Sequence, residues 1–167
     1  MSRDQHILVK AFTTYVRPLL EYCSPVWSPH LKKFIHMIEN VQRRFTKRIG
    51  GISHLTYPAR LQLLGLEALQ ERRLKFDLIM CHKVMYNFVE VDTSDFFCLY
   101  SDDRTRGHNV RLVKPACNLD VRKYCFSSRV VDLWNNLPRP VVNLTSVNSF
   151  KSALNHLDFT ALCDFSN

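Results

Sequence analysis

The segment from Leu31 to Ile49 limits the possible folds more than any other part of the sequence. Its apolar residues recur every three or four positions, which places them on one stripe of an α-helix. With Leu31 at 0° and 100° per residue around the helix axis, they lie between about 280° and 40°. They are Leu31, Phe34, Ile35, Ile38, Val41, Phe45 and Ile49. Gly50 and Gly51 follow, as expected after a helix with a left-handed C-terminal cap. A helix with one apolar stripe must pack on neighbouring elements.

Helical spacing of apolar residues continues through most of the chain. Asp4 can cap a first helix, which Pro18 should kink or end. Thr56 can begin and Gly65 can end a short helix. Besides the segment 31–49, the predicted helices cover residues 4–18, 56–64, 67–88, 120–134 and 146–157. The chain is therefore expected to be mainly α-helical, and the apolar circumference of the 67–88 helix predicts a central, buried position.

One short segment has the character of a strand, and its position suggests two lobes. Residues 110–114 combine three apolar residues, two of them valines, with two basic ones and are followed by Pro115, which predicts a short strand or hairpin arm. Residues 90–104 are acidic and irregular, so they are expected to form a linker. The predicted organisation is a helical bundle over residues 1–89 and a small C-terminal lobe over residues 105–167, with the strand and two helices. Trp134, at helical spacing, is expected in the core.

The net charge of +8 is confined to the first half of the chain. Residues 1–83 contain 14 Lys and Arg against 6 Asp and Glu, whereas residues 84–167 contain 9 of each kind. On the 31–49 helix, six basic residues lie between about 100° and 260°, opposite the apolar stripe. They are Lys32, Lys33, Arg43, Arg44, Lys47 and Arg48, and only Glu39 offsets them within the helix.

This basic face predicts binding to a polyanion. Like charges at (i, i+4) cost a few tenths of a kcal/mol per pair, and phosphate groups would remove that cost. The alternative is a solvated helix face without a ligand. Arg72 and Arg73 could extend the track, so the predicted nucleic-acid-binding residues are the six helix residues with these two. A second basic group is expected to pair with the acids of residues 90–103: Arg104, Arg106, His108, Arg111 and Lys114.

The sequence lacks the patterns of the common catalytic and metal sites. Tyr100-Ser101-Asp102-Asp103 imitates the paired aspartates of reverse transcriptases, but Arg104 and Arg106 follow where a second apolar strand is required. No nucleophile elbow, phosphate loop or closely spaced cysteine pair occurs. We therefore expect that this chain has no catalytic residue, metal or cofactor of its own. Six cysteines without framework spacing and no long apolar run indicate an intracellular protein, in nucleus or cytoplasm, outside the membrane.

Several blocks of sequence carry a family resemblance. In chain order they are VRPLLEYCSPVWSP from Val16, ENVQRRFTK from Glu39, LQLLGL from Leu61, Arg72-Arg73, TRGH from Thr105, FSSRVV from Phe126, WNNLP from Trp134, and Phe150-Lys151. Their content and order resemble the region after the palm in LINE-type, jockey-like non-LTR retrotransposon reverse transcriptases. The similarity covers nearly the whole chain.

The resemblance implies a helical thumb with a C-terminal extension, the part of an RNA-directed DNA polymerase that holds the template–primer. It implies RNA or an RNA–DNA template–primer as partner through backbone contacts, and the family's palm and fingers as protein partners. The palm and its catalytic aspartates are absent from this sequence, so the chain alone is expected to lack polymerase activity. The alternatives are a domesticated or stand-alone helical module that binds a protein, or an inert remnant of a decayed element.

Overall fold

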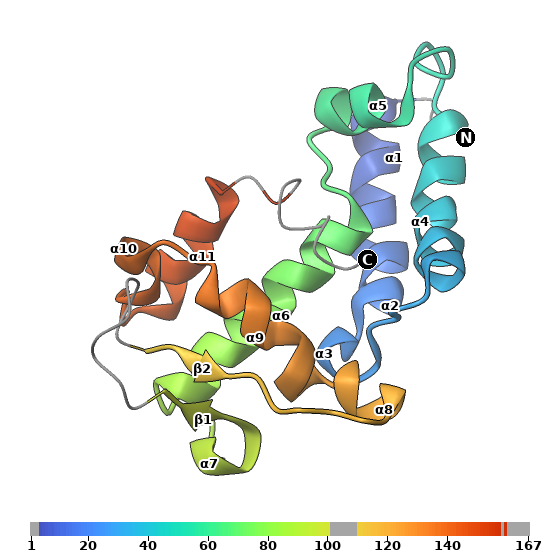
Figure 1. Ribbon diagram of the computed structural model, residues 1–167. Helices are drawn as coiled ribbons and strands as arrows, with labels where there is room; N and C mark the ends of the chain where they lie inside the picture. Colours follow the sequence, from blue (N-terminus) through green and yellow to red (C-terminus); the bar gives the residue numbers. More distant parts are fainter. Residues whose placement is uncertain (1–3, 101–109, 158, 160–167) are drawn as a thin grey trace. The chain divides into compact units, whose positions relative to one another are not determined.

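A computed structural model describes residues 4–100, 110–157 and 159, and these residues are mainly α-helical, as the sequence predicts (Figure 1). They belong to two compact units. The N-terminal unit comprises Met1–Ser24 and Ser28–Arg73, and the C-terminal unit comprises Pro25–Trp27 and Leu74–Asn167. The main division therefore falls between Arg73 and Leu74, inside a helix, and not in the predicted linker of residues 90–104.

The N-terminal unit begins with a helix that continues past Pro18. Its three consecutive parts are α1 (Gln5–Ala11), the π-helical turn η1 (Phe12–Val16) and α2 (Arg17–Glu21). Asp4 caps it as predicted, because its Oδ1 accepts a hydrogen bond from the His6 backbone N–H at 2.8 Å. Of the two outcomes expected at Pro18, a kink or an end, the helix does not end there. The π turn Phe12–Val16, which ends two residues before Pro18, widens the backbone and so accommodates a ring that would clash with the preceding turn of a regular α-helix.

Three further helices follow in this part of the chain: α3 (Ser24–Trp27), α4 (Lys32–Lys47) and α5 (Tyr57–Leu64). The glycines act as the sequence predicts, since Gly51 has φ +85° after α4 and Gly65 has φ +61° after α5. Both values lie in the left-handed region, which glycine adopts at little cost. The first helix packs on α4 through Phe12 and Phe45, whose rings stack with centroids 4.2 Å apart.

The core of the C-terminal unit is formed mainly by α6 (Leu69–Met85), α9 (Phe126–Asn135) and α11 (Val147–Asn155). Its fully buried residues include Leu78 and Val84 on α6 and Phe150 on α11. Trp134 on α9 is also fully buried, as predicted, and its Nε1–H donates to the Val110 carbonyl at 2.8 Å. The bulky aromatic is thus buried with its polar atom satisfied.

Two short strands form the predicted hairpin beside this core. β1 (Cys98–Leu99) pairs antiparallel with β2 (Leu112–Val113), and Leu99 lies opposite Leu112. A short helix, α7 (Thr93–Phe96), precedes β1, so residues 90–100 are more regular than the sequence suggested. Asn135 completes the edge, because its side-chain amide accepts from the Leu112 N–H at 2.9 Å and donates to the Leu112 carbonyl at 2.8 Å.

The predicted helix over residues 120–134 is interrupted. It consists of α8 (Asp120–Lys123) and α9, separated by Tyr124 and Cys125. Cys125 has extended backbone angles, φ −67° and ψ 160°, and occupies the N-cap position of α9. A short helix, α10 (Arg139–Val142), connects α9 with α11. Among the described helices, none has the length and apolar character needed to cross a lipid bilayer.

Candidate nucleic-acid interface

The inward face of α4 is more polar than the sequence predicts. Glu39, Gln42 and Thr46 are buried on it, whereas Phe34 and Val41 of the predicted apolar stripe are largely exposed. On a helical projection at 100° per residue, the centre of Glu39, Gln42 and Thr46 is turned by about 70° from the centre of the apolar stripe. The apolar stripe therefore packs inward only in part.

A hydrogen-bond network around Glu39 explains this rotation. The Glu39 carboxylate accepts from the backbone N–H groups of Leu69 and Gln70, each at 3.2 Å, at the start of α6. Ala68, directly before α6, has no side-chain oxygen that could cap the helix. Glu39 therefore supplies a carboxylate to the N-terminus of a helix 30 residues away in sequence, where unpaired N–H groups and the helix dipole favour a negative charge.

Tyr57 and Gln42 complete the network. The Tyr57 hydroxyl donates to Glu39 Oε1. Gln42 Nε2 donates to the Tyr57 hydroxyl at 3.1 Å and to the Glu67 carbonyl at 2.9 Å. Burial raises the pKa of Tyr57, and the hydrogen bond to Glu39 raises it further. The network thus connects α4, α5 and the start of α6 through a neutral phenol and a carboxylate.

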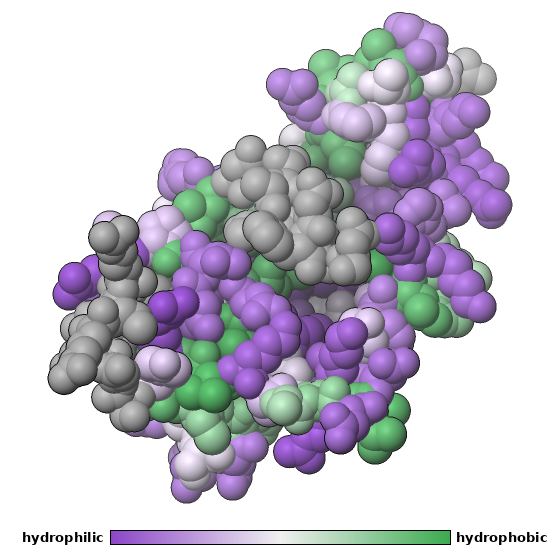
Figure 2. All heavy atoms as spheres, in the orientation of Figure 1, coloured by the Kyte–Doolittle hydropathy of each residue, from purple (hydrophilic) through white to green (hydrophobic). Residues whose placement is uncertain are grey.

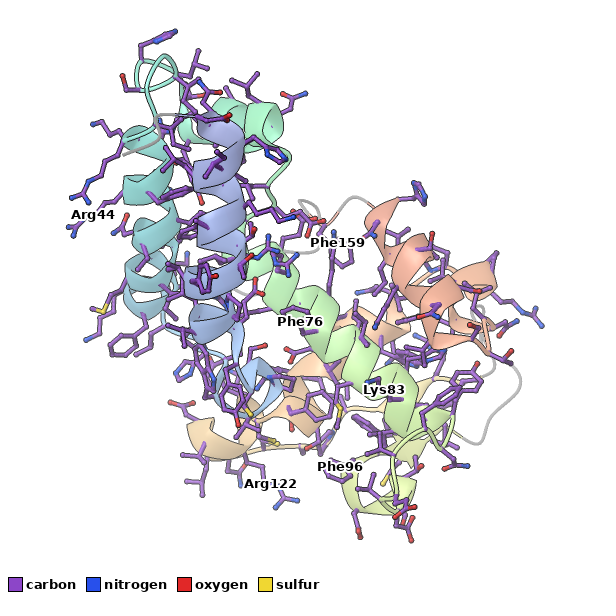
Figure 3. All side chains as sticks on the ribbon, turned by 180° about the vertical axis from the view of Figure 1, so that it is seen from behind. Arg44, Phe76, Lys83, Phe96, Arg122 and Phe159 are labelled. Atoms are coloured by element: carbon purple, nitrogen blue, oxygen red, sulfur yellow. The ribbon has the colours of Figure 1, made fainter. Side chains whose placement is uncertain are left out.

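The outward face of α4 carries the six basic residues that the sequence singled out. All six are exposed: Lys32, Lys33, Arg43, Arg44, Lys47 and Arg48. Figure 3 shows Arg44 projecting away from the ribbon of α4. Hydrophilic residues dominate the visible surface over α4 (Figure 2), while hydrophobic ones gather near the lower ends of α2 and α4. The only acidic residue of α4 is Glu39, which is buried, so the exposed face of this helix has basic side chains without an acidic neighbour on the same helix.

These basic side chains have few partners. Within the described part of the chain, none of the six forms an ion pair. The Arg43 guanidinium lies 4.5 Å from the Tyr57 ring centre, and Lys33 Nζ lies 4.8 Å from that of Phe34. Such contacts orient the cations over the ring face and leave their charge available to an anion.

The two ends of α4 differ electrostatically. Arg44 and Lys47 lie in the last turn, where the helix dipole favours positive charge. Lys32 and Lys33 lie in the first turn, which contains no acidic residue and where the dipole disfavours positive charge. Solubility alone gives no reason for placing cations at this unfavourable end. An anion bound there would relieve the repulsion.

Arg72 and Arg73 do not extend the exposed face. Arg72 forms a two-pronged ion pair with Glu21, with distances of 2.5 and 3.1 Å, and a further contact with Glu67 at 3.3 Å. Arg73 is only 2% exposed. Both residues therefore stabilise the fold in this conformation, and we exclude them from the candidate interface. Glu21 lies 51 residues from Arg72, so helical periodicity could not reveal this ion pair.

The second basic group is only partly described. Arg104, Arg106 and His108 lie outside the described residues, as do Asp102 and Asp103. Lys114 pairs with Asp132 of α9, and with none of the described acids of residues 90–100. Among the described residues, no group of three or more His, Cys, Asp or Glu side chains could hold a metal ion.

The N-terminal unit also exposes several large apolar residues. On α4 these include Phe34, Met37 and Val41, which follow helical spacing beside the basic face. On and after the first helix they include Tyr15, Leu19 and Tyr22, each at least three-quarters exposed. Single exposed apolar residues are common, but several on one small unit indicate a surface that a partner could cover.

Comparisons with known proteins give little information about function. No protein-family model and no solved structure matches the chain. An uncharacterized protein of Caenorhabditis elegans is 27% identical over 88 residues, which cover 49% of this chain and 44% of that protein. The match thus spans less than half of the relative's length, and the relative's name states no activity.

Proposed function

We propose that the N-terminal unit binds the phosphate backbone of nucleic acid through the outward face of α4. One observation supports this most strongly: five exposed basic residues of α4 and Arg48 at its C-cap share a helix whose single acidic residue is buried and engaged elsewhere. In this proposal the ligand is RNA or an RNA–DNA template–primer, and the contacts fix its position without reading its sequence.

The dimensions of α4 suit a phosphate backbone. At 1.5 Å per residue, the distance from Lys32 to Arg48 along the helix axis is about 24 Å. Duplex DNA carries one negative charge per about 1.7 Å of its axis, so several phosphates fall within that length. Arg43 and Lys47, like Arg44 and Arg48, are (i, i+4) pairs of like charge. Their repulsion destabilises the free helix and is relieved by a bound polyanion.

The sequence resemblance gives this binding a place in a larger protein. We propose that the chain is the thumb and C-terminal region of a LINE-type reverse transcriptase, which grips the template–primer and supplies no catalytic residue itself. The parent enzyme's palm and fingers would then be protein partners. The proposed location is intracellular, in the nucleus or cytoplasm. The five described cysteines are free, which agrees with a reducing compartment.

The exposed apolar residues support a second candidate function, binding of a protein partner. Phe34, Met37 and Val41 on α4, with Leu19 and Tyr22 near α2, could be covered by another polypeptide. This candidate predicts that replacing Phe34 and Met37 by Ser removes partner binding and leaves nucleic-acid affinity within about twofold. The phosphate proposal predicts the reverse pattern for the basic residues.

Charge reversal with a matched control tests the proposal. The test variant replaces Arg43, Arg44, Lys47 and Arg48 by Glu. The control changes the same charge by replacing four exposed basic residues of the C-terminal unit by Glu: Arg122, Lys123, Arg139 and Lys151. Affinity for a fluorescent RNA–DNA primer–template is measured by anisotropy at about 50 mM salt, and circular dichroism checks the helical content.

The proposal predicts at least about a hundredfold weaker binding for the α4 variant, since several phosphate contacts are lost. The control variant should bind within about tenfold of the wild type. Equal losses in both variants would show that net charge matters and that the α4 face does not. Wild-type affinity retained by a folded α4 variant would contradict the proposed interface directly.

A further inference from the structure

Two cysteines of the C-terminal unit converge on one serine. Cys125 is the N-cap residue of α9, and Cys117 lies in the segment between β2 and α8. The Ser128 hydroxyl is 3.6 Å from the Cys125 sulfur and 3.7 Å from the Cys117 sulfur. The two sulfurs are therefore separated by no more than the sum of these distances. The break between α8 and α9, which the sequence did not predict, produces this arrangement.

Hydroxyl and backbone N–H groups near Cys125 stabilise its thiolate, although its thiol donates to the Arg122 carbonyl at 3.0 Å in this structure. Its sulfur lies 3.3 Å from the Ser127 hydroxyl, and its own position is the N-terminus of a ten-residue helix. Burial raises the pKa of Cys125, but the hydroxyl and backbone N–H groups of Ser127 and Ser128 outweigh it, so the pKa lies below its usual value. A thiolate that is partly exposed and stabilised at a helix N-terminus is the typical reactive cysteine.

Cys117 is placed to act as its partner. It is partly exposed, like Cys125, and its sulfur also approaches the Pro115 carbonyl at 3.4 Å. Residues 114–119 belong to no helix or strand, so the backbone can adjust when the two sulfurs approach bonding distance. By contrast, Cys81 is fully buried, and burial raises its pKa well above the usual value. The C-terminal unit thus contains an inert core thiol and a pair of accessible ones.

We propose that Cys125 and Cys117 form a peroxide-sensitive thiol pair, with Cys125 attacking and Cys117 resolving. The Cys125 thiolate attacks one oxygen of hydrogen peroxide, the O–O bond breaks, and hydroxide leaves with formation of a sulfenic acid. The Cys117 thiolate then attacks the Cys125 sulfur. The S–O bond breaks, a disulfide joins the two residues, and the departing hydroxide combines with the proton that the Cys117 thiol released on ionising, which gives water. A dithiol reductant restores both thiols.

The disulfide would tie the segment after β2 to the start of α9 and close a loop that contains α8. Arg122 and Lys123 lie within this loop (Arg122 is labelled on α8 in Figure 3). Trypsin cleaves after both residues, so it separates Cys117 and Cys125 into different peptides unless a disulfide joins them. This position makes the bond directly observable by mass spectrometry.

The experiment treats the full chain with a small excess of hydrogen peroxide at pH 7, blocks remaining thiols with iodoacetamide, and analyses non-reduced tryptic peptides. The wild type should yield the cross-linked pair, which dithiothreitol abolishes. Cys117→Ser should instead accumulate the Cys125 sulfenic acid, trapped by dimedone. Cys125→Ser should leave Cys117 unmodified. Cys98→Ser, which changes an exposed thiol of the same unit, should not alter the cross-link.

A second measurement needs no variant. In the untreated wild type, iodoacetamide at pH 7 should modify Cys125 at least about threefold faster than exposed Cys98, because the hydroxyl and N–H groups at the start of α9 stabilise the Cys125 thiolate. Absence of the cross-linked pair from a folded, oxidised wild type would overturn the proposal. So would a Cys125 alkylation rate equal to that of Cys98.

Discussion

Replacing Glu39 by Ala should destabilise the N-terminal unit far more than an ordinary substitution on a basic helix. The Glu39 carboxylate accepts from the Leu69 and Gln70 N–H groups and from the Tyr57 hydroxyl. The alanine variant leaves these three donors without the acceptor they have in the wild type. Since Glu39 is only 8% exposed, water replaces the carboxylate poorly.

The expected magnitude follows from these contacts. Loss of a helix cap costs about 1 kcal/mol, and loss of a partly buried charge at a helix N-terminus costs up to about 2 kcal/mol. An unsatisfied buried hydroxyl adds about 1 to 3 kcal/mol. These contributions overlap, because the same carboxylate makes all the contacts. We therefore expect a decrease of about 2 to 4 kcal/mol in the free energy of unfolding.

Urea unfolding followed by circular dichroism measures this decrease, and native-state amide exchange at Leu69 and Gln70 locates it. The matched controls are Glu39→Gln, which keeps one acceptor oxygen, and Tyr57→Phe, which removes only the hydroxyl. Each should cost about 1 to 2 kcal/mol. A loss below about 0.5 kcal/mol for Glu39→Ala would mean that the carboxylate does not cap α6 in solution.

Two further predictions concern the C-terminal unit. Burial lowers the pKa of His82, so the folded state binds fewer protons there than the unfolded state. The stability contributed by neutral His82 is complete above about pH 6.5 and declines as the pH falls toward the lower folded pKa. Unfolding at several pH values should show this slope, and His82→Asn should reduce it. Arg129 forms a two-pronged ion pair with Asp77 at 2.8 and 2.9 Å, and Asp77 is 1% exposed. Asp77→Ala should therefore cost about 3 to 5 kcal/mol, and Asp77→Leu with Arg129→Met should cost less, because no buried charge remains. An equal loss in the double variant, measured by urea unfolding, would show that packing and not the charge determines the effect.

Local signals in the sequence predicted the helix boundaries well. Asp4 and Gly65 cap helices through contacts and backbone angles that involve only residues next to them in sequence, so capping rules were enough to predict both. Trp134 was predicted correctly because a large aromatic at helical spacing has few alternatives to burial. The break at Cys125 was missed because the helical spacing of apolar residues continues across it. The extended backbone of Cys125, at the N-cap of α9, leaves no signal in that spacing.

The sequence did not reveal which side chains pair with residues far away along the chain. Glu39 was interpreted as the one charge that offsets the basic face of its helix, but it caps α6. Arg72 was interpreted as part of a phosphate track, but Glu21, 51 residues away, neutralises it. Periodicity assigns a residue to a helix face and does not reveal which other chain segment meets that face. The six basic residues of α4 remain a prediction about binding that their exposure supports.

The most direct test of the phosphate-binding proposal is the salt dependence of primer–template binding by the wild-type chain. If the basic face of α4 neutralises most of the phosphates that its six cations can reach, the plot of log affinity against log salt should fall with a slope between about −3 and −5. The variant with Glu at Arg43, Arg44, Lys47 and Arg48 should show a slope shallower by about 3. A folded wild-type chain whose affinity is absent, or does not change with salt, would contradict the proposal.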